Sequence, residues 1–205
     1  MPKIEYVFLD FDGTLVNSLP VLYNIYDEFL KIFGFRGDKD EFNKLNGPSI
    51  EENVAYLKNK YSIPFSKEYL LQKYNEKIDE IYSEKISPFS ESETALKYLK
   101  DKNYKLALVS SSKKRYVLNI INKQDWGKYF SFLISGDDLI RAKPNPDIYE
   151  LACKKIDVDK LKILVVEDSY NGFLSATTAG LRCVLVGEKG ILLNEVKLFL
   201  EDATK

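Results

Sequence analysis

The sequence contains no histidine among its 205 residues. This absence excludes Ser-His-Asp and Cys-His triads, phosphohistidine chemistry and most zinc sites, because each of them depends on an imidazole. Carboxylates, hydroxyls, lysines and backbone amides remain as the groups that could carry catalysis. A metal held by such oxygen donors would be a hard cation rather than zinc.

Cysteine is also scarce, and neither a long apolar run nor an excess of one charge is present. Cys153 and Cys183 stand alone in apolar segments, so we expect core thiols rather than a disulfide or a metal pair. No apolar run approaches the ~20 residues of a membrane span. Thirty basic and thirty-one acidic residues leave a net charge of −1, which argues against nucleic acid as the main ligand. We expect a cytoplasmic protein with no membrane partner and no signal peptide.

Short apolar segments alternate with helical ones in the second half of the chain. The segments expected to be strands are residues 7–9, Leu106–Val109, Phe132–Ser135, Ile163–Val166 and Cys183–Val186. The segments expected to be helices are Glu93–Lys102, Arg115–Asn122, one with Asn145 as its cap and Pro146 in its first turn, Gly172–Ala179, and one from Leu193. This alternation predicts an α/β protein with a doubly wound parallel sheet.

The pattern differs between the first strand and residue 87. Apolar residues from Leu22 to Phe33 recur at helical spacing, Ser49 and Glu52 have the spacing of a capping box, and Ser66 begins a third helix. We therefore expect a small helical cap domain, residues 17–87, inserted into a core formed by residues 1–16 and 88–205.

Polar residues follow the predicted strands where each of them ends. Asp10 and Asp12 follow the first strand, and the others are Ser110, Ser111, Ser112, Ser135, Asp137, Asp138, Lys143, Glu167 and Asp168. Each group alone is typical of a turn or a helix cap. Ligands of open α/β sheets bind beyond the carboxyl ends of the strands, so these groups are expected to meet at one edge. Carboxylates, hydroxyls and a lysine together suit a phosphoryl group held with Mg²⁺.

Four motifs are similar to those of the haloacid dehalogenase superfamily. They are DFDGT at residues 10–14, Ser110 after an apolar strand, KPNPDIY at 143–149, and VVEDSYNGFLSATTAG at 165–180. The resemblance is to the branch with phosphoglycolate phosphatases and beta-phosphoglucomutase, which have a Rossmann-like core and a helical cap. It implies Mg²⁺-dependent hydrolysis of a small phosphorylated metabolite through an aspartyl-phosphate intermediate.

The resemblance also implies a role for each matching residue. Asp10 would be the nucleophile, and Asp12 the general acid/base whose backbone carbonyl also binds the metal. The implied metal site consists of Asp10, Asp12, Glu167 and Asp168. The implied phosphate-binding groups are Gly13, Thr14, Ser110, Ser111 and Lys143. Dehalogenases of the superfamily lack an acid at the position of Asp12, which disfavours dehalogenation.

The segment Leu45–Glu52 resembles the cap loop that closes over the site in this branch. The mutases have an arginine after the loop serine that binds a second phosphate, whereas this chain has Ile50. A phosphatase is therefore favoured over a sugar phosphomutase. A phosphorylatable receiver domain and a non-enzymatic binding protein of the same fold are further alternatives. Residues 16–19 and 87–90 are the expected hinges of the cap, and the protein is expected to be a monomer.

Cap side chains are expected to select the leaving group. Tyr23, Asn46 and Tyr56 are candidates for contact with it. For each of these side chains, packing in the core of the cap or exposure on its surface is favoured over contact with a leaving group.

Overall fold

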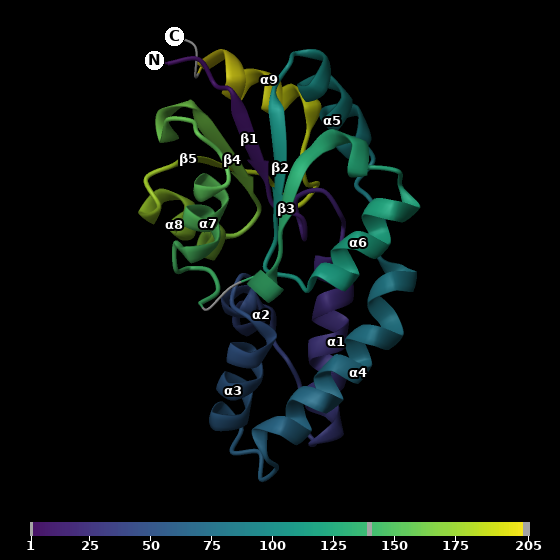
Figure 1. Cartoon of the computed structure of the whole chain (residues 1–205). Coiled ribbons are helices and arrows are strands. Elements are labelled where there is room, and N and C mark those ends of the chain that lie inside the picture. The colour runs from purple at the N-terminus through teal and green to yellow at the C-terminus, as the bar shows by residue number, and fades with distance from the viewer. Residues whose placement is uncertain (1, 139–140, 203–205) are drawn as a thin grey trace.

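The computed structural model describes residues 2–138 and 141–202, and its centre is one parallel sheet (Figure 1). The strands are β1 (Tyr6–Leu9), β2 (Lys105–Val109), β3 (Phe130–Ile134), β4 (Ile163–Glu167) and β5 (Arg182–Leu185). Their spatial order is β3-β2-β1-β4-β5, and every pairing is parallel. The first strand therefore lies in the middle of the sheet.

The register aligns the carboxyl ends of the three central strands. Leu9 of β1 is level with Leu108 of β2 and with Val166 of β4. The four residues of β1 are all buried, as expected for an apolar strand with neighbours on both sides. Asp10 is the residue that follows β1, and it consequently lies at the carboxyl edge of the sheet, between the ends of β2 and β4.

Helices cover both faces of the sheet. The helices α5 (Ser92–Asp101), α6 (Lys114–Lys123) and α9 (Leu193–Asp202) contribute to one apolar cluster, and α7 (Asp147–Lys154) and α8 (Tyr170–Thr178) contribute to another. Two apolar layers on one sheet confirm the predicted doubly wound α/β architecture. Cys153 and Cys183 are free and half-buried.

The remaining helices form a separate group beyond the carboxyl edge of the sheet (Figure 1). They are α1 (Leu19–Ile32), α2 (Lys39–Leu45), α3 (Ile50–Lys60) and α4 (Lys67–Lys85). In this group α4 packs against both α1 and α3. The division of the chain at residues 17 and 88 stays a prediction.

Two connections lead into and out of this helical group, and they run side by side. Val16 and Pro88 form an antiparallel bridge. The Asn17 amide donates to the Ser87 carbonyl at 2.9 Å, and the Phe89 amide donates to the Leu15 carbonyl at 3.1 Å. The two segments expected to act as hinges are therefore hydrogen-bonded to each other.

Several helix boundaries differ from those expected. Helix α8 begins two residues before Gly172, because the Ser169 side chain caps it by accepting from the Gly172 amide. Asn145 is not the cap of α7, because its side-chain amide donates to the Ala142 carbonyl at 3.0 Å and closes a turn. The short helix α2 was not expected. The capping box of Ser49 and Glu52 and the cap at Ser66 are confirmed.

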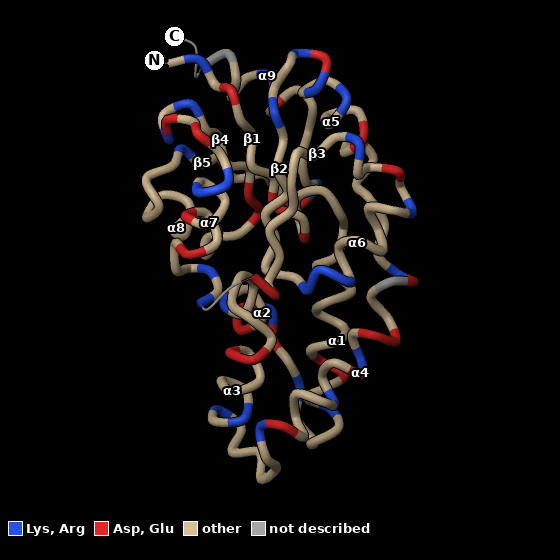
Figure 2. The backbone as a smooth tube through the Cα atoms, viewed as in Figure 1, with Lys and Arg blue, Asp and Glu red and all other residues tan. Residues whose placement is uncertain are grey.

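Basic and acidic residues are interspersed over the sheet half and the helical half of the molecule (Figure 2). Among the described residues, no helix combines the length and the apolar character needed to cross a membrane. The charge balance of the sequence thus corresponds to a mixed surface.

Candidate active site

The site begins at the end of the central strand, with a buried carboxylate and a buried ammonium. Asp10 is 5% exposed and Lys143 is 2% exposed. Lys143 Nζ donates to Asp10 Oδ1 at 2.7 Å and to Glu167 Oε1 at 2.5 Å. Burial and the Glu167 charge raise the pKa of Asp10 well above its usual range. Burial alone would lower the pKa of Lys143, but Asp10 and Glu167 outweigh it and raise that pKa.

Glu167 is fully buried, and neighbouring side chains hold it in place. Its Oε1 also accepts from the Tyr149 hydroxyl at 2.5 Å, and its Oε2 lies 3.4 Å from the donating Ser169 hydroxyl. Tyr149 is part of α7 and Ser169 is the N-cap of α8, so side chains from two different helices hold this carboxylate. Tyr149 belongs to the KPNPDIY motif, but the sequence analysis assigned it no role.

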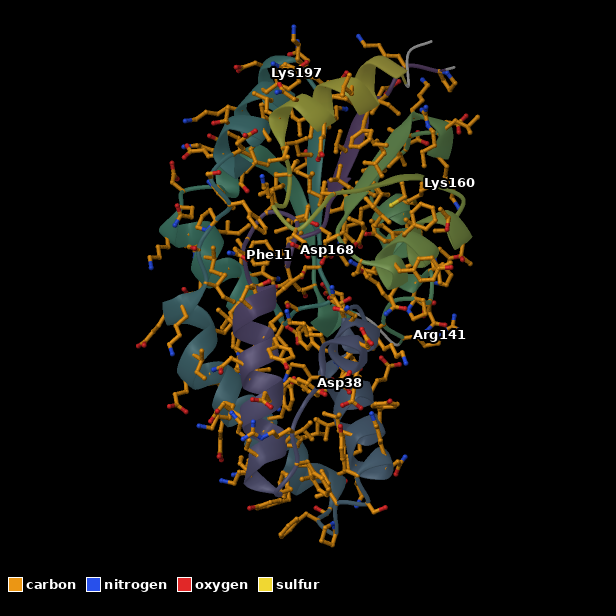
Figure 3. All side chains as sticks on the ribbon, turned by 180° about the vertical axis from the view of Figure 1, so that it is seen from behind. Phe11, Asp38, Arg141, Lys160, Asp168 and Lys197 are labelled. Carbon is orange, nitrogen blue, oxygen red and sulfur yellow. The ribbon has the colours of Figure 1, made fainter. Side chains whose placement is uncertain are left out.

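Asp168 follows Glu167 and lies where the sheet meets the helical group (Figure 3). Burial and the Glu167 charge raise the pKa of Asp168 to about 7. Gly13 allows the close approach of this carboxylate, because a Cβ on Gly13 would lie 2.2 Å from Asp168 Oδ2. The φ angle of Gly13 is +79°, and this backbone conformation by itself favours glycine.

The acidic residues at this edge fit a hard divalent cation. Asp10, Glu167 and Asp168 each offer an oxygen, and these atoms lie within 4.8 Å of one another. The Lys143 ammonium pairs with Asp10 and Glu167, and burial, followed by the charge of Glu167, raises the pKa values of Asp10 and Asp168. Carboxylate oxygens are the donors that Mg²⁺ prefers. Asp12 is outside this group, and metal binding by its backbone carbonyl stays a prediction.

The side chain of Asp12 points toward the helical group. The Tyr82 hydroxyl of α4 donates to Asp12 Oδ1 at 2.6 Å, and the Ser112 hydroxyl donates to Oδ2 at 2.6 Å. Ser112 is among the polar residues expected to meet at this edge of the sheet. No sequence signal identified the Tyr82 hydroxyl, because a tyrosine also fits the apolar face of a helix.

The hydroxyls predicted to bind phosphate are buried beside these carboxylates. Ser110 is 1% exposed, and its Oγ accepts from the Ser112 amide at 3.0 Å. The Ser111 and Thr14 hydroxyls are buried and have no hydrogen-bond partner among the described residues. Ser110, Ser111 and Lys143 line the same cleft as Asp10 and Asp12, whereas Gly13 and Thr14 are not among its described lining residues.

The cleft has a volume of about 110 Å³ and lies between the sheet edge and the helical group. Its helical wall is largely apolar, with side chains that include Leu22, Phe42, Ile50, Tyr74 and Ile78. Of the three candidates for contact with a leaving group, Asn46 lines the cleft, whereas the described lining does not include Tyr23 or Tyr56. A second cavity of about 310 Å³ shares Ile50, Ser111 and Lys113 with the first.

Residues 7–186 match the model of a protein family described as haloacid dehalogenase-like hydrolases. The chain belongs to this family. The family match therefore confirms the resemblance drawn from the four motifs. The family match excludes the alternative that the chain is a phosphorylatable receiver domain.

Relatives of this haloacid dehalogenase-like hydrolase include named phosphatases. A phosphorylated carbohydrates phosphatase of Thermotoga maritima is 29% identical over 200 residues, which are 97% of this chain and 91% of the relative. A phosphoglycolate phosphatase of Pseudomonas fluorescens is 29% identical over 90% of this chain and 69% of its own length. The beta-phosphoglucomutase of Clostridium difficile shares the fold, with a TM-score of 0.81, 24% identity and coverage of 98% and 97% of the two chains. The predicted class, a phosphohydrolase, is confirmed.

Proposed function

We propose that this haloacid dehalogenase-like hydrolase is a Mg²⁺-dependent phosphatase that hydrolyses a small phosphomonoester through an aspartyl-phosphate on Asp10. One observation carries the proposal: Asp10 lies at the cleft floor with the Lys143 ammonium 2.7 Å from Oδ1, within a group of three carboxylates. Such a site can accept a negatively charged phosphoryl group only if cations neutralise it. The observed arrangement supplies one ammonium and a set of oxygens suited to a divalent cation.

Asp10 acts as the nucleophile in the proposed reaction. Because Lys143 binds Oδ1, Oδ2 is the atom that attacks phosphorus. A bond forms between Oδ2 and phosphorus while the bond between phosphorus and the ester oxygen breaks. Lys143 and the hydroxyls of Ser110 and Ser111 bind the phosphoryl oxygens during this transfer.

Asp12 transfers the protons in both half-reactions. Its protonated carboxyl gives a proton to the departing alkoxide, and its carboxylate then takes one from the water that attacks the aspartyl-phosphate. The second attack releases inorganic phosphate and regenerates Asp10. In the present arrangement each oxygen of Asp12 accepts one hydrogen bond, from Tyr82 and from Ser112, which leaves a second lone pair on each oxygen for a substrate proton.

Asp10, Glu167 and Asp168 would hold the Mg²⁺ ion. When bound, the ion neutralises charge on the phosphoryl oxygens. Glu167 additionally orients Lys143, which it contacts at 2.5 Å. Burial, followed by the charge of Glu167, raises the pKa values of Asp10 and Asp168, and a bound cation would favour the ionised form of both carboxylates.

Ile50 favours a hydrolase over a sugar phosphomutase, because an apolar side chain at this point of the cleft cannot bind a second phosphate.

Relatives at 29% identity are named for phosphorylated carbohydrates and for phosphoglycolate, and both are candidate substrate classes. One core and one helical segment together line the cleft, so we propose that the protein can act as a monomer, and that it acts in the cytoplasm.

The test is phosphate release from a panel of phosphomonoesters with Mg²⁺. The panel contains phosphoglycolate, hexose and pentose phosphates, nucleotides and pyrophosphate. We expect release from one group, lost on chelation and reduced at least ~10⁴-fold in Asp10→Asn, which removes the nucleophile. Asp125→Asn, an exposed position paired with Lys128, is the matched control and should retain activity.

Full activity in a folded Asp10→Asn protein would contradict the mechanism. Interconversion of a sugar phosphate on addition of a bisphosphate, without net phosphate release, would favour the mutase. The fold of the variant is checked by circular dichroism, and we expect it to be retained because asparagine can still accept from Lys143.

A further inference from the structure

The loop between α2 and α3 reaches the acidic edge of the sheet through one side chain. Asn46, the C-cap of α2, donates from Nδ2 to Asp168 Oδ2 at 3.0 Å. The two residues are 122 positions apart in the chain. A side chain of the inserted helical segment therefore binds directly to a carboxylate of the candidate cation site.

The backbone around Asn46 is itself held by the core. Asn171, in the first turn of α8, donates from Nδ2 to the Asn46 carbonyl at 2.6 Å and to the Lys44 carbonyl at 3.3 Å. Gly47 has a φ of +110°, and a Cβ there would lie 2.7 Å from Asn171 Cβ. A larger residue at position 47 would separate the two surfaces, so the loop and α8 are closely fitted.

Asp168 depends on this contact for its orientation. Among the described residues, the Asn46 amide is the hydrogen-bond donor found for its carboxylate. Glu167, in contrast, is held by Lys143 and Tyr149 of the core. Carboxylates that bind metal ions are themselves held by hydrogen bonds, and the loss of such a partner typically weakens metal binding by roughly 10- to 100-fold.

We propose that Asn46 is a positioning residue of the cation site: it orients Asp168, so that the site is complete only while the helical cap is docked on the core. This inference rests on the proposed metal-dependent function. Because coupling between two equilibria is reciprocal, a bound cation then stabilises the docked cap, and a docked cap raises the affinity for the cation. The enzyme thereby links metal loading to closure of its cleft.

The first test is the affinity of the protein for Mg²⁺ without substrate, measured by isothermal titration calorimetry. We expect Asn46→Ala to weaken Mg²⁺ binding about tenfold. Asn46→Leu keeps a similar volume without the donor and should behave in the same way. Asn75→Ala is the matched control, because Asn75 also joins the helical group to the core, by accepting from Lys113 at 3.0 Å, but is not described as contacting any of the carboxylates.

The second measurement is hydrogen exchange at residues 45–50 with and without Mg²⁺. We expect Mg²⁺ to slow exchange of this loop in the wild type and not in Asn46→Ala, which a purely local structural role would not produce. Equal affinity of the wild type and both Asn46 variants, or tighter binding by the variants, would overturn the inference and leave the proposed phosphatase intact. A wild type that does not bind Mg²⁺ would overturn both.

Discussion

At the scale of single residues, the acidic edge is defined by charges that repel one another. Asp168 lies beside Glu167, and burial removes the water that would otherwise screen the pair. A proton on Asp168, whose pKa is raised to about 7, relieves this repulsion in the absence of a cation. The folded protein therefore binds a proton at pH values at which the unfolded chain has already lost it.

The stability of the metal-free protein should depend on this proton. The contribution of Asp168 is fully present below about pH 4 and is lost as the pH rises through about 7. We expect Asp168→Asn, which cannot ionise, to exceed the wild type in unfolding free energy by roughly 2–4 kcal/mol at pH 8, and by little at pH 4. Urea denaturation of metal-stripped protein at both pH values measures the difference.

Mg²⁺ serves as the control for this experiment. At pH 8 the ion should raise the stability of the wild type more than that of Asp168→Asn, because it replaces the missing proton. A difference between the two proteins that does not change with pH would contradict the explanation.

Residue identity predicted the charged groups of the site but not all of their partners. Asp10 and Lys143 could be found from the sequence, because the motifs DFDGT and KPNPDIY that contain them resemble those of a known family. Tyr82 and Tyr149 could not, because a tyrosine contributes to an apolar helix face whether or not its hydroxyl binds a carboxylate. Asn46 was a candidate for contact with the leaving group of the substrate. Its hydrogen bond with Asp168 could be found only from the tertiary structure.

At the scale of elements, helix caps determine where the segments around the cleft begin. In α3 the Ser49 Oγ accepts from the Glu52 amide at 3.2 Å, and Glu52 accepts from the Ser49 amide at 2.8 Å. This capping box ends the loop that carries Asn46. The spacing of serine and glutamate made it predictable from the sequence.

Ser49→Ala should lower the unfolding free energy by about 1 kcal/mol, because an amide at the start of α3 loses its acceptor. Ser66→Ala, which removes the acceptor of the Tyr69 amide at the start of α4, is the comparison and should cost less. Thermal unfolding with matched circular dichroism at 222 nm measures both. An effect of Ser49→Ala no larger than that of Ser66→Ala would show that the additional bond from the Ser49 hydroxyl to Glu52 adds nothing.

Helix α2 escaped prediction because its stability comes from contacts far apart in the sequence. It has seven residues, and its buried residues are Glu41 and Leu45. Glu41 accepts from the Tyr26 hydroxyl of α1 and, at 2.7 Å, from the Tyr61 hydroxyl at the end of α3. From the sequence, a glutamate is expected on the surface. The buried Glu41 therefore does not contribute to an apolar periodicity, and the sequence of α2 showed no pattern that predicts a helix.

At the scale of the whole molecule, the helical group that we expect to act as a cap contacts the sheet half on two sides of the cleft. Asn46 meets Asp168 on one side, and Arg115 of α6 pairs with Asp79 of α4 at 2.6 Å on the other. The strand order around β1 was not predicted from the sequence, whereas the fold class followed from the motifs and the alternation of strands and helices. The docked position of the cap did not, because it depends on side-chain contacts between segments that are distant in the sequence.

We expect the cap to open by rotation at residues 16–19 and 87–90. Opening would separate both contacts and admit a substrate, and a bound phosphate analogue would favour closure. Small-angle X-ray scattering should therefore give a smaller radius of gyration with Mg²⁺ and orthovanadate than without them. A radius that does not change on addition of the analogue, together with unchanged hydrogen exchange at both hinges, would contradict the prediction.

The pairing of the two connections has a further consequence for the architecture of the chain. Because Asn17 and Ser87 are hydrogen-bonded neighbours, the ends of the core on either side of the cap already meet. A segment whose ends lie side by side can be lengthened, shortened or exchanged at little cost in loop-closure entropy. We therefore expect the sheet and the helical segment 17–87 to be separable modules, so that a different helical segment could be grafted at this point without a change in the register of the sheet.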